Sequence, residues 1–285
     1  MGKFARSWAL MKASASMLRS DKSLMMFPLL SGLCSLVVAA SFLIPIAVTL
    51  GVVHHATANE TRGFSLVAYL GMFVFYLVQY FIIIFFNTAL AGTVLARLRG
   101  ETATMSTGFA VARARWGSIL GYAMIAATVG LFLRALQERL GLVGRMIAGL
   151  FGLAWTVASL LVVPVLASQQ VGPMDAVSRS VALLKRTWGE NLIGQGGIGV
   201  VFSVVTVIAT FACGLLVVAA ITSQSMPAIV AAIALGVISL ITLALAHSAL
   251  QGIYAAVLYR YAESGEVGGG FEPKLLEQAF RVRAD

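Results

Sequence analysis

The chain has 285 residues, of which 60% are hydrophobic and only 11% are charged, and its mean hydropathy is +0.94. These values exclude an ordinary water-soluble domain, because most of such a chain must be surrounded by lipid. The formal net charge of +9 comes from 20 Lys and Arg residues against 11 Asp and Glu residues. Both cysteines, Cys34 and Cys213, lie inside apolar runs, which predicts neither a disulfide framework nor a zinc site.

Six apolar runs are long enough to cross a hydrocarbon layer of about 30 Å, because a helix needs about 20 residues to do so. The predicted spans are residues 24–53, 64–96, 117–133, 147–168, 192–221 and 228–259. The third is the shortest and runs into Arg134, so the sequence leaves open whether it crosses fully. The prediction is an all-α protein, a polytopic transmembrane helical bundle. It forms a single domain over residues 1–262 and ends in a short cytoplasmic tail over 263–285.

The distribution of Lys and Arg among the loops predicts the orientation. Four cations, Arg62, Arg134, Arg139 and Arg145, lie on one side of the predicted membrane, and the other 16 lie on the opposite side. Because Lys and Arg are enriched in cytoplasmic loops, both termini should lie in the cytoplasm and the protein in the cell inner membrane. Membrane orientation and anionic headgroups thereby explain the positive charge, and no nucleic-acid partner is needed.

A basic amphipathic segment precedes the first, third and fifth predicted spans. In residues 174–188, Val177, Val181, Leu184 and Trp188 recur at helical spacing, whereas the cations lie off that stripe. The N-terminal arm and residues 108–121 have the same layout. The pattern predicts three repeated units, each a basic interfacial helix followed by a hairpin of two spans. The Gly after each of the last two Trp residues is predicted to let the backbone turn into the span.

The interfacial helices supply two sets of candidate residues. The predicted interfacial anchors are Trp8, Trp116 and Trp188. The predicted lipid-headgroup contacts are Arg6, Lys12, Arg113, Arg115, Arg179, Lys185 and Arg186. Because polybasic segments beside a span attract anionic lipid, anionic phospholipids are the expected partners. An alternative for the Trp residues is a specific docking role for a lipid head or a protein.

Ionisable groups are rare at membrane depth, because the predicted spans contain no Asp, Glu, Lys or Arg. This argues against a proton-coupled pump or an intramembrane metalloprotease. The candidate intramembrane polar site consists of Asn87, Gln195, His247 and Gln251. The alternative is that these side chains only form hydrogen bonds between helices and fix their register.

Signals for catalysis or for a bound cofactor are weak or absent. His54, His55 and Glu60 could bind a metal, but the set lacks Cys and a fourth ligand. No nucleophile, base and orienting residue form a recognisable set, and no nucleotide-binding fingerprint is present. We therefore expect no enzyme activity, no cofactor and no metal.

Residues 133–145 form the longest loop on the side opposite the termini. Leu133, Leu136, Leu140 and Val143 share a face, which predicts a further amphipathic helix there. Glu138 should pair with either Arg134 or Arg145.

Nearly the whole chain resembles an uncharacterised bacterial family of six-span integral membrane proteins described only as a domain of unknown function. The resemblance rests on Arg6-Ser7-Trp8, Asp21-Lys22, Phe27-Pro28-Leu29-Leu30-Ser31-Gly32, Phe86-Asn87-Thr88-Ala89-Leu90, Leu140-Gly141-Leu142-Val143-Gly144-Arg145 and Arg186-Thr187-Trp188-Gly189-Glu190-Asn191. In layout the chain is also similar to the membrane domains of some glycerophosphodiester phosphodiesterases, without a counterpart of their catalytic domain. The resemblance implies the fold and supplies no activity.

Two classes of function follow from these patterns. The first is a membrane scaffold that interacts with lipid, with a membrane-protein partner or with further copies of itself, and has no catalytic activity. The alternative is a transporter or permease for a small neutral or amphiphilic solute, which the intramembrane polar site motivates. Broken helices in an inverted repeat would favour transport. The repeat in this sequence has the same orientation each time, and the spans lack coupling charges, so the scaffold is the leading hypothesis.

Overall fold

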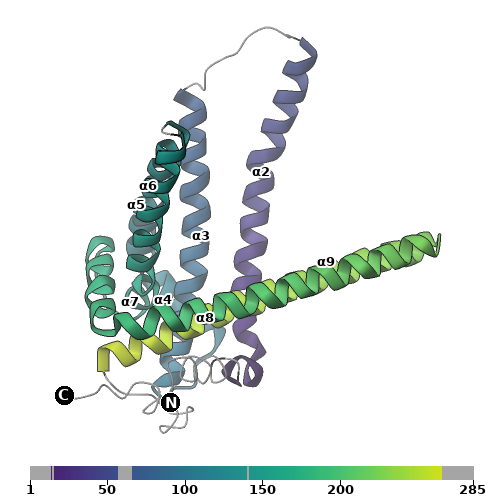
Figure 1. Cartoon of the computed structure of the whole chain (residues 1–285). Coiled ribbons are helices and arrows are strands. Elements are labelled where there is room, and N and C mark those ends of the chain that lie inside the picture. The colour runs from purple at the N-terminus through teal and green to yellow at the C-terminus, as the bar shows by residue number, and fades with distance from the viewer. Residues whose placement is uncertain (1–13, 15, 57–65, 140, 265–285) are drawn as a thin grey trace. The chain divides into compact units, whose positions relative to one another are not determined.

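The computed structural model describes residues 14, 16–56, 66–139 and 141–264, with their side chains except at 46–56, 66–69, 139, 141–143, 186–198 and 264. All regular secondary structure in these ranges is helical (Figure 1), which confirms the predicted all-α class. The elements are the 3-10 helix η1 (Lys22–Met25) and the helices α2 (Met26–Ala56), α3 (Leu66–Leu98), α4 (Met105–Ala114), α5 (Trp116–Arg139), α6 (Gly141–Ser159), α7 (Val162–Ser168), α8 (Pro173–Thr222) and α9 (Met226–Ser264).

Six helical stretches of the described chain are long and apolar enough to cross a membrane. They are Lys22–Pro45, Leu70–Leu98, Trp116–Glu138, Gly144–Ser168, Gly199–Thr222 and Met226–Glu263. Each overlaps one predicted span, so the predicted number is confirmed. The third stretch, which the sequence left open, has 23 residues. At about 1.5 Å per residue a helix of this length is sufficient to cross a bilayer core.

The chain divides into two compact units. The first unit consists of Met1–Pro28, Val94–Thr102 and Lys185–Asp285, and the second consists of Leu29–Thr93 and Ala103–Leu184. Helices α2, α3 and α8 contribute residues to both units.

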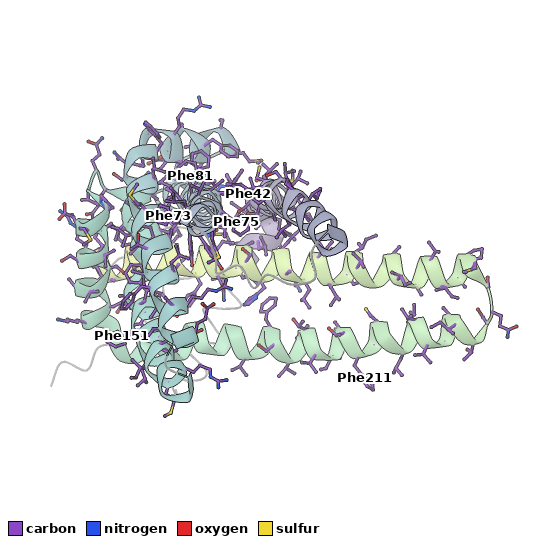
Figure 2. All side chains as sticks on the ribbon, turned by 90° about the horizontal axis from the view of Figure 1, so that it is seen from above. Phe42, Phe73, Phe75, Phe81, Phe151 and Phe211 are labelled. Atoms are coloured by element: carbon purple, nitrogen blue, oxygen red, sulfur yellow. The ribbon has the colours of Figure 1, made fainter. Side chains whose placement is uncertain are left out.

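In the second unit, neighbouring helices are joined by aromatic and polar contacts. The rings of Phe42 on α2 and Phe75 on α3 have centroids 5.4 Å apart (Figure 2). Four residues further along α3, Gln79 Nε2 donates to the backbone oxygen of Ser35 on α2 at 3.0 Å. Helices α5 and α6 pack side by side (Figure 1), although only residue 140 separates them in the chain. The chain therefore folds back on itself between the third and fourth spans.

In the first unit, α9 contacts both η1 and the apolar part of α8. Leu24 in η1 and Tyr254 in α9 are both buried, and the two elements pack together. The His247 ring on α9 stacks on Phe202 of α8, with centroids 4.6 Å apart. Phe211 is 70% exposed and lies on the side of α8 away from α9 (Figure 2). Such an apolar surface is expected where a helix faces lipid.

Local sequence explains where α3 ends. Gly100 has φ +83°, a left-handed conformation that glycine adopts without a steric penalty. Its N–H donates to the carbonyl of Arg97, and the N–H of Glu101 donates to the carbonyl of Ala96. This pair of hydrogen bonds satisfies carbonyls that the end of a helix leaves free, so it fixes Arg97 in the last turn of α3.

The prediction of a backbone turn at Trp188-Gly189 is wrong. Helix α8 continues from Pro173 to Thr222 without interruption, so the basic segment before Gly189 and the apolar span after it form one helix. A single Gly costs a helix only about 1 kcal/mol and does not end it. The turn before the third span also differs from the prediction, because it lies at Arg115, before Trp116 rather than after it.

The prediction of a separate amphipathic helix over residues 133–145 is also wrong. Helix α5 continues to Arg139 and α6 begins at Gly141, so these residues extend the two spans. The expected pairing of Glu138 with Arg134 is confirmed at 2.9 Å, and Arg134 Nη1 also donates to the hydroxyl of Tyr76 on α3. These contacts hold charged side chains together at the ends of apolar helices, where water is within reach.

The contact between α8 and α9 predicts a specific cross-link. A Cβ atom at Gly236 would lie 3.4 Å from the Cβ of Cys213 and 3.6 Å from its sulfur. Disulfides join Cβ atoms about 3.5 to 4.5 Å apart, so the Gly236→Cys variant should form an intramolecular disulfide with Cys213 on mild oxidation. The measurement is the loss of maleimide-reactive thiols in a Cys34→Ser background. The matched control is Gly236→Cys with Cys213→Ser. Two thiols that stay reactive in the first variant would contradict the pairing.

Candidate functional site

The fourth span is discontinuous. Helix α6 ends at Ser159 and α7 begins at Val162, with a turn at Leu160 and Leu161 between them. Leu161 has φ −102° and ψ 3°, outside the helical range, and the Leu160 N–H bonds the carbonyl of Val157 rather than continuing the helical pattern. Pro164 contributes to the break, because it has no N–H to donate to the carbonyl four residues earlier.

A serine from α8 satisfies the backbone at this break. The Ser180 hydroxyl donates to the carbonyl of Ala158 at 2.6 Å and accepts from the N–H of Leu161 at 3.2 Å. Ser180 is fully buried. An unsatisfied backbone group costs several kcal/mol in hydrocarbon, so one hydroxyl stabilises both sides of the interrupted helix.

The residue before Ser180 contacts the other end of α7. Gln169 follows α7 and closes its last turn by donating its N–H to the carbonyl of Val165 at 2.9 Å. Arg179 Nη1 donates a hydrogen bond to the side-chain oxygen of Gln169. Two adjacent residues of α8 therefore hold α7 at both ends.

Helix α5 positions the start of α8. The Ser118 hydroxyl donates to the carbonyl of Val171, in the connection between α7 and α8, at 2.9 Å. Gly121 faces Pro173, the first residue of α8, so closely that a Cβ at this position would lie 2.9 Å from the proline Cγ. A larger residue at 121 would push the first turn of α8 away, which makes the glycine a requirement of this packing.

Two further hydroxyl groups lie in the same region of the second unit. The Tyr122 ring on α5 stacks on Trp155 of α6, with centroids 6.3 Å apart. Its hydroxyl interacts with that of Ser159 at the end of α6. The Ser159 hydroxyl is buried and makes no hydrogen bond of normal geometry in the described structure. The break in the fourth span is thus surrounded by uncharged polar groups.

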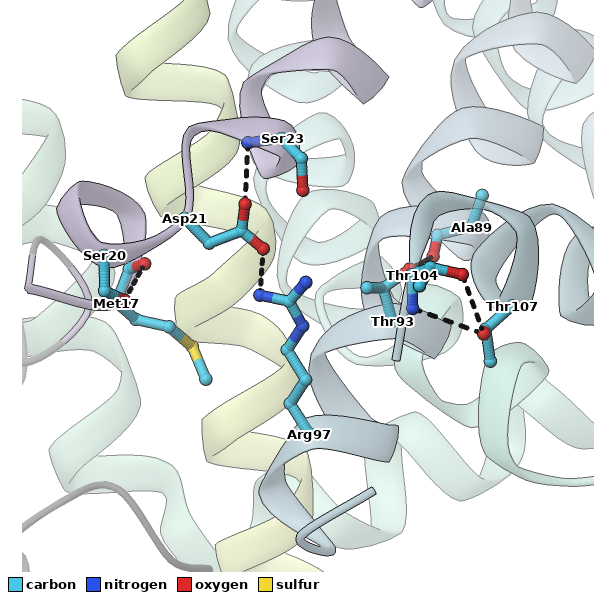
Figure 3. A network of polar contacts seen from close by, with 9 residues as sticks. All are labelled: Met17, Ser20, Asp21, Ser23, Ala89, Thr93, Arg97, Thr104 and Thr107. Atoms are coloured by element: carbon cyan, nitrogen blue, oxygen red, sulfur yellow. Dashed lines mark hydrogen bonds and ion pairs between the residues drawn. The ribbon is translucent and has the colours of Figure 1, made fainter. Parts of the chain in front are cut away.

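A separate polar contact lies in the first unit (Figure 3). The Asp21 carboxylate forms an ion pair with Arg97 and accepts from the N–H of Ser23 at 2.8 Å, which caps η1. Partial burial raises the pKa of Asp21. The hydrogen bonds from Ser23 and Arg97 lower the pKa by more than burial raises it, so the pKa lies below its ordinary value of 3.8. The contact joins the start of the first span to the end of the second.

The basic residues of α4 and α8 that the structure describes are accessible. Arg113 on α4 and Arg179 and Lys185 on α8 are exposed, and Arg115 is half-buried. Trp116, the first residue of α5, is 60% exposed. This combination of cations and an accessible indole is suited to the headgroup region of a bilayer.

The structure brings together two members of the predicted intramembrane site. His247 and Gln251 lie one turn apart on α9, and His247 Nε2 is buried without a hydrogen-bond partner. Asn87 lies on α3 in the second unit, half-buried. Gln195 lies on α8, but its side chain is outside the described structure, as are those of Arg186 and Trp188.

Other predicted residues fall outside what the structure describes. Arg6, Trp8 and Lys12 belong to this group, together with Glu60 and the tail beyond Ser264. Within residues 14, 16–56, 66–139 and 141–264, no group of three His, Cys, Asp or Glu side chains could hold a metal ion.

The contacts around α7 were not predicted from the sequence. Residues 147–168 read as one uninterrupted span, because Leu160 and Leu161 are as apolar as their neighbours. Pro164 was the available signal, since proline inside an apolar run often marks a kink or a helix end. Nothing in the local sequence indicates that Ser180, 19 residues beyond Leu161, supplies the missing hydrogen bonds.

The six apolar helices and their contacts define a multi-pass membrane protein with an all-helical fold. A family model described as a family of unknown function (DUF6159) matches residues 66–270, which is well over half of the chain, so the chain belongs to this family. No curated protein and no solved structure matches the chain.

The Asp21 contact predicts a pH-dependent contribution to stability. Asp21→Asn keeps a side-chain oxygen for the cap but removes the ion pair, whereas Asp21→Ala removes both the cap and the ion pair. The midpoint of thermal unfolding in detergent should therefore be highest for wild type, lower for Asp21→Asn and lowest for Asp21→Ala. A half-buried ion pair of this kind and a helix cap are each worth about 1 kcal/mol. Because the pKa of Asp21 is lowered in the folded state, its contribution is present above pH 3.8 and is lost as the pH falls through the lower folded-state value.

The advantage of wild type over Asp21→Asn should therefore persist from pH 7 to pH 5 and shrink only below the ordinary pKa of 3.8. Asp175→Asn, which changes an exposed carboxylate on α8, is the control. If Asp21→Asn unfolds at the wild-type temperature at pH 7, the ion pair contributes nothing.

The Ser180 contact predicts a large effect from a small change. Ser180→Ala leaves the buried Leu161 N–H and Ala158 carbonyl without their partner, which should destabilise the protein by about 1 to 3 kcal/mol. Thermal unfolding in lipid nanodiscs measures the loss, and hydrogen exchange of peptides covering residues 155–168 locates it. Ser178→Ala, on an exposed position of the same helix, should have little effect. Equal effects of the two changes would rule out a specific role for Ser180.

Proposed function

We propose that this protein is a membrane scaffold that gathers anionic phospholipids around its basic interfacial surface and has no catalytic activity of its own. In this proposal the basic ends of α4 and α8 face the cytoplasm, the protein lies in the cell inner membrane, and both termini are cytoplasmic. Its partners are anionic lipids together with a membrane protein or further copies of the chain. Nucleic acid has no part in it.

The observation that carries the proposal is the exposure of Arg113, Arg179 and Lys185, together with that of Trp116, three residues after Arg113. Arg113 lies just before the apolar stretch that begins at Trp116, and Arg179 and Lys185 lie on the helix whose apolar stretch begins at Gly199. In this proposal these cations lie at headgroup depth. Each Lys or Arg near an anionic surface contributes on the order of 1 kcal/mol before screening by salt. Several such residues at the headgroup level would enrich anionic lipid locally.

The positions of the charged residues in the described spans favour a scaffold over an ion-coupled transporter. The charged residues in the six stretches lie near their ends, as Lys22, Arg97, Arg134, Glu138, Arg145, Arg260 and Glu263 do. Proton and ion pathways usually carry ionisable groups at membrane depth. Apart from the His247 ring, the described stretches hold no Asp, Glu, Lys or Arg away from their ends that could couple a gradient to movement of a solute.

A second candidate function is transport of a small neutral or amphiphilic solute. The discontinuous fourth span favours it, since transporters often build their binding sites at broken helices. The uncharged hydroxyls of Tyr122, Ser159 and Ser180 near the break would suit a neutral solute rather than an ion. The similarity in layout to the membrane domains of glycerophosphodiester phosphodiesterases that the sequence suggests fits either candidate, because it concerns layout alone.

Lipid co-purification tests the scaffold proposal. The double variant Arg113→Gln, Arg179→Gln should lose much of the enrichment of anionic lipid over the host membrane, while insertion of the spans is unchanged. The matched control is Arg99→Gln, Arg145→Gln. Arg99 is paired with Glu101, and Arg145 lies on the opposite side in the predicted orientation, so this control should retain the enrichment. The same lipid content in wild type and in the first variant would refute the proposal.

A further inference from the structure

Helix α7 is a separately held segment of the fourth span. The break at Leu160 and Leu161 disconnects it from the hydrogen-bond ladder of α6. On its other side, the Ser118 hydroxyl holds the connection to α8 at Val171. Between these points, the two residues of α8 that bind its ends are Arg179 and Ser180. The segment can therefore move as a rigid body if its hydrogen bonds to Arg179 and Ser180 of α8, called its polar ties below, change.

The polar ties matter more here than they would in a water-soluble protein. The faces of α7 that pack on the unit are apolar, with Leu161, Val162, Val165 and Leu166 fully buried. Lipid tails are as apolar as these side chains, so their burial provides little net driving force in a bilayer. Hydrogen bonds and packing geometry then decide whether α7 stays docked.

The two polar ties differ in accessibility and in chemistry. Ser180 is fully buried and bonds only backbone groups. Arg179 is exposed, and its partner in this contact is the neutral side-chain amide of Gln169. A guanidinium binds a phosphate through paired, charge-assisted hydrogen bonds about twice as strong as neutral ones. An anionic headgroup can therefore compete with Gln169 for Arg179.

We infer that α7 is a lipid-sensitive segment. A phospholipid phosphate that binds Arg179 removes its hydrogen bond to Gln169, so α7 is held less firmly to α8 and opens more often at the break in the fourth span. The inference rests on the proposed function, because it requires anionic lipid at the basic surface. It goes further by naming the residue that responds and the element that moves.

Hydrogen exchange of the full chain in nanodiscs tests the inference. Peptides covering residues 160–169 are followed in phosphatidylcholine alone and in phosphatidylcholine with phosphatidylglycerol, and bound lipid is measured in the same samples. Loss of one net hydrogen bond predicts exchange about fivefold faster with phosphatidylglycerol. Inorganic phosphate added to phosphatidylcholine nanodiscs should leave the rate unchanged. Acceleration by phosphate alone would overturn the assignment to a lipid headgroup.

Variants separate the response from the binding. Arg179→Gln should exchange at one rate in both lipids, because the group that responds is gone. Arg113→Gln should bind less anionic lipid yet keep the difference between the two lipids, since its Arg179 is intact. Ser180→Ala should exchange fast in both, because the second tie is missing, whereas Ser178→Ala should behave as wild type.

The outcomes distinguish this inference from the function on which it rests. Wild type that does not enrich phosphatidylglycerol would refute both. Enrichment with the same exchange rate in both lipids would refute only the release of α7. A response that persists in Arg179→Gln would overturn the assignment of this residue.

Discussion

A backbone buried in lipid must satisfy every N–H and C=O group within the protein, and this constraint shapes the described structure more than any other. Unbroken helices meet it by their own hydrogen bonds, as the 50 residues of α8 do. The fourth span does not, because its helix stops at Ser159 and resumes at Val162. The Ser180 hydroxyl supplies a donor and an acceptor where the ladder is interrupted, so the break depends on a side chain from another helix.

The same lipid environment restricts where charged side chains lie. Charged side chains are costly in hydrocarbon, and in the six apolar stretches of the described chain the Asp, Glu, Lys and Arg residues lie near the ends, some of them in pairs. Asp21 binds Arg97, and Arg134 binds both Glu138 and Tyr76. Each contact joins two elements as well as neutralising charge: the first links η1 to α3, and the second links α5 to α3. Polar contacts thereby supply part of the specificity between helices that apolar burial supplies in water-soluble proteins.

Prediction from the sequence was strongest where a feature depends on composition and weakest where it depends on distant contacts. The six spans follow from the lengths of the apolar runs, and the pairing of Glu138 with Arg134 follows from helical spacing. The turn at Gly189 was wrong because one glycine weakens a helix without ending it. The partners of Asp21 and Leu161 are Arg97 and Ser180, and no local pattern connects residues so far apart in the chain. The predicted site residues were chosen for polarity at depth, and of these only His247 and Gln251 share a helix in the same unit.

The kind of signal that could act on α7 follows from the groups that hold it. In the described contacts between α8 and the two ends of α7, the hydroxyl of Ser180 and the amide of Gln169 are neutral. Neither a proton gradient nor a membrane potential therefore acts on these two groups directly. Arg179 carries the charge, and it lies exposed near the start of α8, outside the apolar stretch Gly199–Thr222. A guanidinium forms its strongest hydrogen bonds with anions, so an anionic partner can change the contacts of Arg179. A stimulus that reaches α7 by this route must therefore be an anion at the membrane surface.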